Sequence, residues 1–225
     1  MKPLIISLFD YSGTMILPWS IAGWKTLQID KAHPPILAKT GPNKWIFGGD
    51  YTEVYKALFL GGWTKEDVQF VFSFPPCTDL ASSGARWWKQ KRQNDWGFQI
   101  KAMRAVLFAE ELAKHADCGY MIENPVGAIP RNWRKWDHRF HPHQFTGFCA
   151  DDNYYKSTCL WTKDFIMPSD NKNPALGKPD KRIHMMPGGK SQKRKRSYTP
   201  SGFSWAVYYA NHENIAWRMK TVRAG

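Results

Sequence analysis

The chain lacks a long apolar run at its start: residues 4–9 are apolar apart from Ser7, but they are too few for a membrane span or for the core of a secretion signal. Cysteines are few as well, and no two of them have the C-x-x-C spacing of a metal site. We therefore expect no association with membranes, a cytoplasmic location and four reduced thiols, at Cys77, Cys118, Cys149 and Cys159.

Acidic residues are scarce relative to basic ones: 19 Asp and Glu stand against 32 Lys and Arg, which gives a net charge of +13. Such an excess indicates a polyanionic partner, most commonly nucleic acid. The cations gather in residues 86–92, 131–136 and 190–196, and the first two clusters interleave them with tryptophan. This mixture suits phosphate pairing together with stacking on bases, although a merely solubilising surface is the alternative. The candidate contacts are Arg86, Lys89, Lys91, Arg92, Lys193, Arg194, Lys195 and Arg196.

No internal repeat is visible along the 225 residues. Apolar runs separated by glycine and proline predict strands at residues 4–9, 25–29, 45–47, 68–72 and 119–122. The spacing of apolar residues predicts helices at residues 16–22, 98–115 and 203–218. Strands that alternate with helices predict an α/β fold with a doubly wound, mainly parallel sheet.

Residues 169–197 differ from the rest in composition, because they are rich in Asn, Pro, Gly, Lys and Arg and poor in apolar residues. We expect a loop or a poorly ordered basic insertion there. The folded domain then comprises residues 1–168 and 198–225.

Cys77 follows two prolines, Pro75 and Pro76, directly after the predicted strand at residues 68–72. Proline stops a strand and stiffens the loop, so the thiol is expected to be held at the end of that strand. A thiol fixed there is a candidate nucleophile. The alternative is that Cys77 is one small buried residue among four cysteines.

Other candidate groups follow the remaining predicted strands. Asp30, Asp50 and Glu123 each come at the end of one strand, and residues 9–14 form a glycine-containing turn after the first. Each group alone is more commonly a turn or cap residue. Because the carboxyl ends of parallel strands lie at one edge of a sheet, where ligands bind, the whole series is expected to meet there.

These motifs resemble those of the DNA cytosine-5 methyltransferases, especially short phage and prophage members. The resemblance covers roughly residues 4–163, with a weaker trace at 199–210. It rests on Phe74-Pro75-Pro76-Cys77 with Ser83-Gly84, Ile122-Glu123-Asn124-Pro125, Leu8-Phe9 with Ser12-Gly13, and Gly49-Asp50. It implies a Rossmann-like methyltransferase fold, the cofactor S-adenosylmethionine, DNA as partner, and a bacterial or phage-infected host cell.

The resemblance also implies roles for single residues. Cys77 would attack C6 of a cytosine, Glu123 would activate N3, and Lys156 would stand in for one of two arginines that brace the base. The base would have to leave a duplex or be single-stranded. The implied cofactor contacts are Phe9, Ser12, Gly13, Thr14, Gln28, Asp30, Asp50 and Pro76.

The chain departs from the family pattern at several positions. Gln28 stands where the family has an acidic residue for the ribose, so either Gln28 or Asp30 is the candidate there. Pro125 replaces a usual valine, and Thr158 replaces the second bracing arginine. The large target-recognition region is missing. Base readout is therefore expected to be weak, or to come from a short motif or a protein partner.

Four alternatives compete with a cytosine-5 methyltransferase. One is a catalytically weak or inactive DNA-binding protein on the same scaffold, and another is an enzyme that transfers a different group to the same carbon. An amino-methyltransferase is disfavoured, because Cys77 occupies the place of its base-stacking aromatic. A zinc enzyme is also disfavoured and no metal is expected, because no cysteine pair accompanies His138, His141 and His143.

Overall fold

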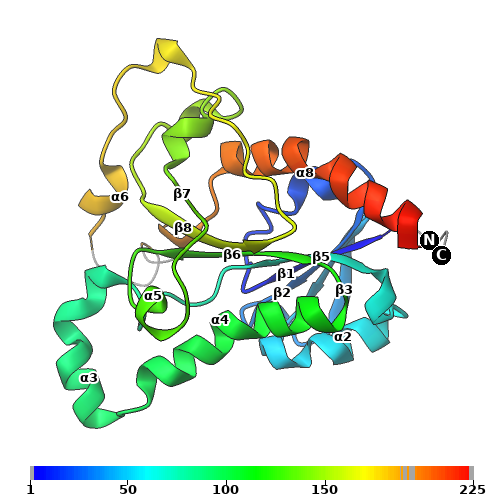
Figure 1. Ribbon diagram of the computed structural model, residues 1–225, viewed down its shortest axis with the longest axis horizontal. Helices are drawn as coiled ribbons and strands as arrows, with labels where there is room; N and C mark the ends of the chain where they lie inside the picture. Colours follow the sequence, from blue (N-terminus) through cyan, green and yellow to red (C-terminus); the bar gives the residue numbers. More distant parts are fainter. Residues whose placement is uncertain (1–2, 188, 190–191, 193–195, 223–225) are drawn as a thin grey trace.

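The computed structural model describes residues 3–187, 189, 192 and 196–222, and a single mixed sheet runs through its centre (Figure 1). Within these residues, eight strands lie in the order β3-β4-β2-β1-β5-β6-β8-β7. Their bounds are β1 (Leu4–Leu8), β2 (Lys25–Ile29), β3 (Leu37–Gly41), β4 (Lys44–Phe47), β5 (Val68–Ser73), β6 (Gly119–Pro125), β7 (His138–Phe140) and β8 (Thr158–Lys163).

The five central strands are parallel, and the antiparallel strands lie at the two sides of the sheet. β4, β2, β1, β5 and β6 pair in parallel, β3 pairs antiparallel with β4, and β8 pairs antiparallel with both β6 and β7. The prediction of an α/β fold with a mainly parallel sheet is therefore confirmed. The carboxyl ends of all five parallel strands share one edge, where such sheets bind ligands.

Helices cover both faces of the sheet. α8 (Ser201–Val222) lies with α1 (Leu17–Ile21) on one face, and α2 (Val54–Gly61) and α4 (Phe98–His115) lie on the other (Figure 1). Further helices are α3 (Trp88–Asn94), α5 (Ile129–Asn132) and α6 (Arg182–Met185). Short 3-10 turns occur at Tyr51–Glu53, Lys65–Asp67, Ser82–Trp87, Pro142–Phe145, Ala150–Asp152 and Pro174–Leu176.

Strand alternation divides the apolar residues between two cores. In β5, Val71 faces the core beneath α4, whereas its neighbours Phe70 and Phe72 face the core beneath α8. α4 contributes Val106 and Ala109, three residues apart on one side of the helix. This spacing is the reason that the predicted bounds 98–115 agree with the helix.

Pairing between distant segments accounts for the differences from the predicted strands. β3, which had not been predicted, forms a hairpin with β4. β6 was expected to end at Ile122, with Glu123 in the following loop; instead it continues to Pro125, because Glu123 is paired with Leu160 of β8. Glu123 is thus held by a strand, which is stiffer than a loop.

None of the helices in the described part of the chain is long and apolar enough to pass through a bilayer. All four cysteines are free thiols, and Cys118 and Cys159 are buried.

Two fully buried tryptophans offer a matched test of the packing. The indole of Trp161 donates a hydrogen bond to the Arg134 carbonyl at 2.8 Å, whereas the indole nitrogen of Trp19 has no partner among the described residues. Both phenylalanine substitutions leave a cavity, but only Trp161→Phe also orphans a carbonyl. We expect chemical denaturation to show a loss for Trp161→Phe that exceeds the loss for Trp19→Phe by about 1 kcal/mol. Equal losses would contradict a stabilising contribution from the hydrogen bond between Trp161 and the Arg134 carbonyl.

Candidate active site at the carboxyl edge of the sheet

The loop that carries Cys77 is attached to the strand that carries Glu123. The loop continues from β5, and Glu123 lies in β6. The two strands are parallel neighbours, and Ser73 at the end of β5 is paired with Ile122 of β6. Beyond that pair, the Asn124 side-chain amide donates to the Pro75 carbonyl at 2.8 Å. This bond fixes the double proline that precedes Cys77.

Backbone hydrogen bonds continue the attachment of the two segments after Cys77 and Glu123. Ser82 N donates to the Val126 carbonyl at 2.9 Å, and Ala128 N donates to the Leu80 carbonyl at 2.7 Å. The Cys77 carbonyl accepts from Leu80 N at 3.0 Å and from Ala81 N at 2.8 Å. The loop is therefore a compact turn against the end of β6.

Gly127 is required for this close approach. A β-carbon at position 127 would lie 1.9 Å from the Leu80 carbonyl oxygen, which belongs to the backbone of the Cys77 loop. Such an atom fits only if one of the two segments moves.

Glu123 and Lys156 form the charged pair of the site. Their side chains are only 12% and 13% exposed, and Lys156 Nζ lies 4.0 Å from Glu123 Oε1. Lys156 Nζ also donates to the Tyr198 carbonyl at 3.4 Å. Burial raises the pKa of Glu123, and the Lys156 ammonium opposes that rise. A mostly buried carboxyl of this kind is suited to hold and release a proton.

Cys77 is partly buried and interacts electrostatically with this pair. Burial and the Glu123 carboxylate raise the pKa of the Cys77 thiol, whereas Lys156 and Arg196 lower it. The structure therefore brings together Cys77, Glu123 and Lys156, which come from three separate parts of the sequence.

A second group of residues lies at the end of β1, and Asp10 organises it. The Asp10 carboxylate accepts hydrogen bonds from Ser7 Oγ at 2.8 Å, Ser12 Oγ at 3.0 Å and Gly13 N at 2.7 Å. Burial raises the pKa of Asp10, although these three donors act in the opposite direction. Thr14 N and its hydroxyl donate in turn to Ser12 Oγ, so the whole turn 10–14 is internally bonded.

Gln28 lies buried beneath this turn. Its side-chain amide donates to the Asp10 carbonyl at 2.8 Å, and its Oε1 has no hydrogen-bond partner among the described residues. Gly13 has φ +67°, and a β-carbon there would lie 2.6 Å from Gln28 Oε1. Glycine is therefore needed both for the backbone conformation and for the contact.

The remaining candidate cofactor residues follow β1, β2, β4 and β5. The Phe9 ring lies 5.1 Å from the Tyr51 ring, and Phe9 is one of the few non-glycine residues with positive φ, at 56°. Asp30 is half-buried and accepts from Ala32 N at 2.8 Å. Pro76 is exposed in the Cys77 loop.

Asp50 already has partners of its own. Its carboxylate pairs with Lys31 Nζ at 2.7 Å and accepts from Thr52 N at 3.2 Å, at the start of the turn Tyr51–Glu53. Burial acts to raise the pKa of Asp50, but the Lys31 and Thr52 hydrogen bonds outweigh it and lower that pKa overall. A ligand at Asp50 would therefore share this carboxylate with Lys31.

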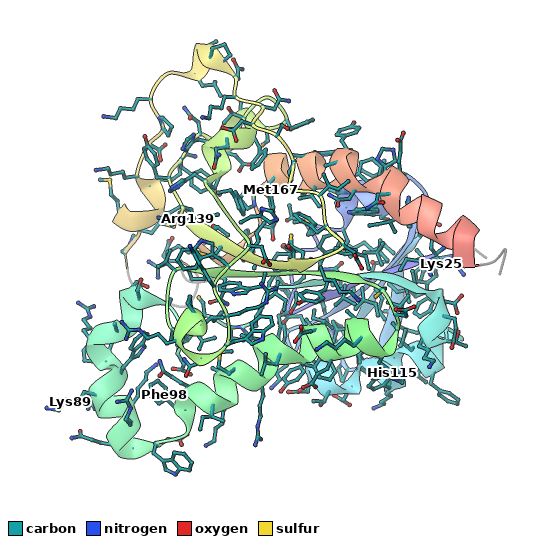
Figure 2. All side chains as sticks on the ribbon, in the orientation of Figure 1. Lys25, Lys89, Phe98, His115, Arg139 and Met167 are labelled. Carbon is teal, nitrogen blue, oxygen red and sulfur yellow. The ribbon has the colours of Figure 1, made fainter. Side chains whose placement is uncertain are left out.

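The basic residues at 86–92 project from the Cys77 loop. Figure 2 places Lys89 on α3, pointing away from the sheet, at the opposite end of the molecule from Lys25. Arg86 and Arg92 are also exposed, and the Arg86 guanidinium lies 5.2 Å from the Trp87 ring centre. Lys91 differs, because it forms an ion pair with Asp79.

The other two basic clusters have different environments. In residues 131–136, Arg134 pairs with Asp137 at 2.7 Å and lies close to the Tyr120 hydroxyl, so it stabilises the fold. In residues 190–196, Lys193, Arg194 and Lys195 lie outside the described residues. Arg196 is described; it is half-buried and donates to the Met186 carbonyl at 3.2 Å.

No group of three or more His, Cys, Asp or Glu side chains in the described part of the chain could hold a metal ion. The rings of His141 and His143 stack 5.5 Å apart, and both contact the Tyr155 ring.

Two residues whose side chains have structural roles in the site were not among the predicted site residues. Asp10 supports the first turn, and Asn124 holds the Cys77 loop. Their positions within Phe9-Asp10 and Glu123-Asn124 are the signal that was available. Their partners are main-chain groups of other segments, and sequence periodicity carries no information about such bonds.

The fold is that of an α/β protein whose mainly parallel sheet is flanked by helices, which is consistent with a Rossmann-like type, and the candidate site lies at the carboxyl ends of the parallel strands. No protein-family model and no curated protein matches the chain.

The contact of Gly127 with the Cys77 loop can be tested with Gly127→Ala. Because the new methyl group would meet a backbone carbonyl, we expect a loss of unfolding free energy of about 2–4 kcal/mol. Gly84→Ala is the matched control in the same loop, since its β-carbon would lie an ordinary 3.4 Å from the nearest atom. We expect a change of about 0.5 kcal/mol or less for it. Similar losses for both variants, measured by chemical denaturation, would refute the contact.

Proposed function

We propose that the protein is a DNA cytosine C5 methyltransferase in which Cys77 is the nucleophile and Glu123 the acid. The observation that carries the proposal is geometric: Cys77 and Glu123 lie at the carboxyl ends of adjacent parallel strands, the Asn124–Pro75 hydrogen bond joins the two segments, and Glu123 pairs with a mostly buried Lys156. A thiol adds poorly to a pyrimidine unless an acid activates the ring, so the reaction needs both groups within one site.

In the proposed reaction the Cys77 sulfur forms a bond to C6 of cytosine while Glu123 protonates or hydrogen-bonds N3. Addition at C6 makes C5 electron-rich. S-adenosylmethionine, when bound, supplies an electrophilic methyl group to C5. Removal of the C5 proton then restores the C5–C6 double bond and expels Cys77 as the thiolate.

Burial raises the pKa values of both Cys77 and Glu123, so each group favours its protonated form in this site. An ionised Glu123 repels the Cys77 thiolate and favours the thiol. When the thiol proton moves to Glu123, that repulsion disappears. The same transfer yields both reactive forms, a thiolate for C6 and a neutral carboxyl group for N3. Lys156 limits how far the Glu123 pKa can rise.

The residues at the ends of β1, β2 and β4 suit S-adenosylmethionine by their chemistry. The buried Oε1 of Gln28 lacks a partner and lies under a glycine turn, where a backbone can approach a ligand closely. Phe9 would face the adenine, Asp30 would hold the ribose, and Asp50 would accept from the adenine amine. Ser12, Gly13 and Thr14 would line the methionine end.

The proposal predicts a covalent complex with DNA that contains 5-fluorocytosine. Fluorine takes the place of the C5 proton and a base cannot remove it, so the thioether bond to Cys77 is not broken. We expect a complex stable to denaturing electrophoresis when wild-type protein, this DNA and S-adenosylmethionine are mixed. Cys77→Ser should abolish it, and Glu123→Gln should reduce it by about a hundredfold or more.

Cys149→Ser is the matched control for the trapping experiment, because Cys149 is also a partly exposed free thiol. This variant should form the complex like the wild type. A wild-type protein that binds DNA but neither traps it nor binds S-adenosylmethionine would refute the proposal in favour of a DNA-binding protein on the same scaffold.

The exposed cations of α3 are proposed to contact DNA phosphates, as their position next to the Cys77 loop suggests. The double substitution Lys89→Gln with Arg92→Gln should weaken binding and reduce the slope of log K against log salt by about 2. The control is Lys25→Gln with Lys65→Gln, which removes the same charge at the amino ends of β2 and β5. A slope that changes equally in both pairs, in a fluorescence anisotropy titration, would exclude α3 as the contact.

A further inference from the structure

The two clusters that mix tryptophan with cations differ in how the structure places their rings. Both tryptophans of the cluster 131–136 are partly buried and pack against the core beneath α4. In the cluster 86–92, Trp88 packs against the same core, whereas Trp87 is 52% exposed; Trp96, just after α3, is 80% exposed. Among the tryptophans whose burial the structure describes, only these two are more than half exposed. Each leaves a large apolar ring in water.

Trp96 projects from an ordered turn between α3 and α4. The Asp95 carboxylate accepts from Gly97 N at 3.0 Å and pairs with Lys101 Nζ at 2.7 Å. Phe98, two residues after Trp96, is buried. The backbone is therefore held on both sides of Trp96, and the indole is presented to solvent by a fixed turn.

The segment that carries these two rings is bonded to the Cys77 loop. Asp79, two residues after Cys77, forms an ion pair with Lys91 of α3. The Asp79 carbonyl also accepts from Gln99 Nε2, in the first turn of α4, at 3.1 Å. Both sides of the turn at Trp96 are thus attached to the loop that holds the candidate nucleophile.

The free charges of this segment are positive and complement phosphate groups. Arg86, Lys89 and Arg92 are exposed and follow one another at three-residue intervals, which places them along one side of the helical turns. None of the three forms an ion pair with another described residue. The acids of the segment and its loop, Asp79 and Asp95, are each paired with a lysine already.

Exposed rings beside unpaired cations favour a single strand over a duplex. An indole stacks on a base only where a base face is free, and in a duplex those faces are covered by the neighbouring bases. A single strand offers its base faces directly, whereas duplex bases must first be unstacked or flipped at an energetic cost. Stacking is also tolerant of sequence, which fits a chain without the large target-recognition region.

We propose that Trp87 and Trp96, together with Arg86, Lys89 and Arg92, form a binding surface for single-stranded DNA beside the Cys77 loop. The indoles stack on bases, and the cations pair with phosphates. The inference rests on the proposed function in taking DNA as the partner, and it deepens that function by naming a single strand as the substrate.

The test compares the affinity of the full-length protein for a labelled single strand of about 15 nucleotides and for a duplex of the same sequence, by fluorescence anisotropy. We expect the wild type to bind the single strand about tenfold more tightly or better. Trp96→Ala should weaken single-strand binding by about fivefold to fiftyfold, because one stacked base is lost, and duplex binding by less than about twofold. Trp96→Phe keeps a ring and should restore most of the affinity.

Two controls separate stacking from charge and from a general surface effect. Trp96→Ala removes no cation, so the slope of log K against log salt should stay at its wild-type value. Phe59→Ala should leave both affinities unchanged, because Phe59 is an equally exposed ring, 82% accessible, on α2, which lies away from α3 (Figure 1). Circular dichroism reports whether each variant is folded, and Trp87→Ala provides a second, independent variant.

A wild type that binds the duplex as tightly as the single strand would overturn the inference, and so would folded Trp87→Ala and Trp96→Ala variants that both keep the preference. The binding assay contains no cofactor and no chemical step, so it can be separated from the trapping experiment. A ring-dependent preference without trapping would leave the surface intact and refute the methyltransferase. Trapping on a duplex, with no effect of either ring, would refute only the surface.

Discussion

The parallel pairing of β5 with β6 is the constraint on which the candidate site depends. It sets Ser73 beside Ile122, and all that follows on the two segments starts from that register. Asn124 then holds the double proline, and Gly127 lets the backbones touch. Because these contacts are mostly between main-chain groups, Cys77 and Glu123 are brought together by the backbone rather than by their own side chains. Placing these two acidic side chains together can therefore cost folding stability, and the backbone contacts still hold them there.

The same edge separates two kinds of environment. Around β1, β2 and β4, turns are bonded internally and polar groups lie near a half-exposed ring, which suits a ligand with several polar parts. Around β5 and β6, a thiol and a carboxyl group share a largely buried place with only a few cations. Burial raises the pKa of both acids, and the charge of the Glu123 carboxylate raises the pKa of the Cys77 thiol further, which couples the two titrations. The proposed chemistry uses that coupling, whereas a structural site would gain nothing from it.

Local patterns predicted the central fold well. β2 and α4 have the predicted bounds, because alternation in the one and three-to-four-residue spacing in the other are properties of the segment itself. β3 was missed, and β6 was predicted too short, because their strand character depends on partners elsewhere in the chain. Asp10 was overlooked for a similar reason. It organises the turn by accepting three hydrogen bonds, and only the folded turn brings the three donors to its carboxylate.

The sequence by itself determined the class of fold, the series of polar groups at the ends of the parallel strands, and the rigid loop before Cys77. These depend on short-range patterns and on the rule that parallel strands end at one edge. Only the tertiary structure decided which of these groups meet, because Lys156 comes beside Glu123 through the pairing of β8 with β6 and bonds to the chain segment that returns into α8. Gln28 and Asp30 are the clearest contrast. They are two residues apart in sequence, yet one is buried beneath a turn and the other is half-exposed at the strand end.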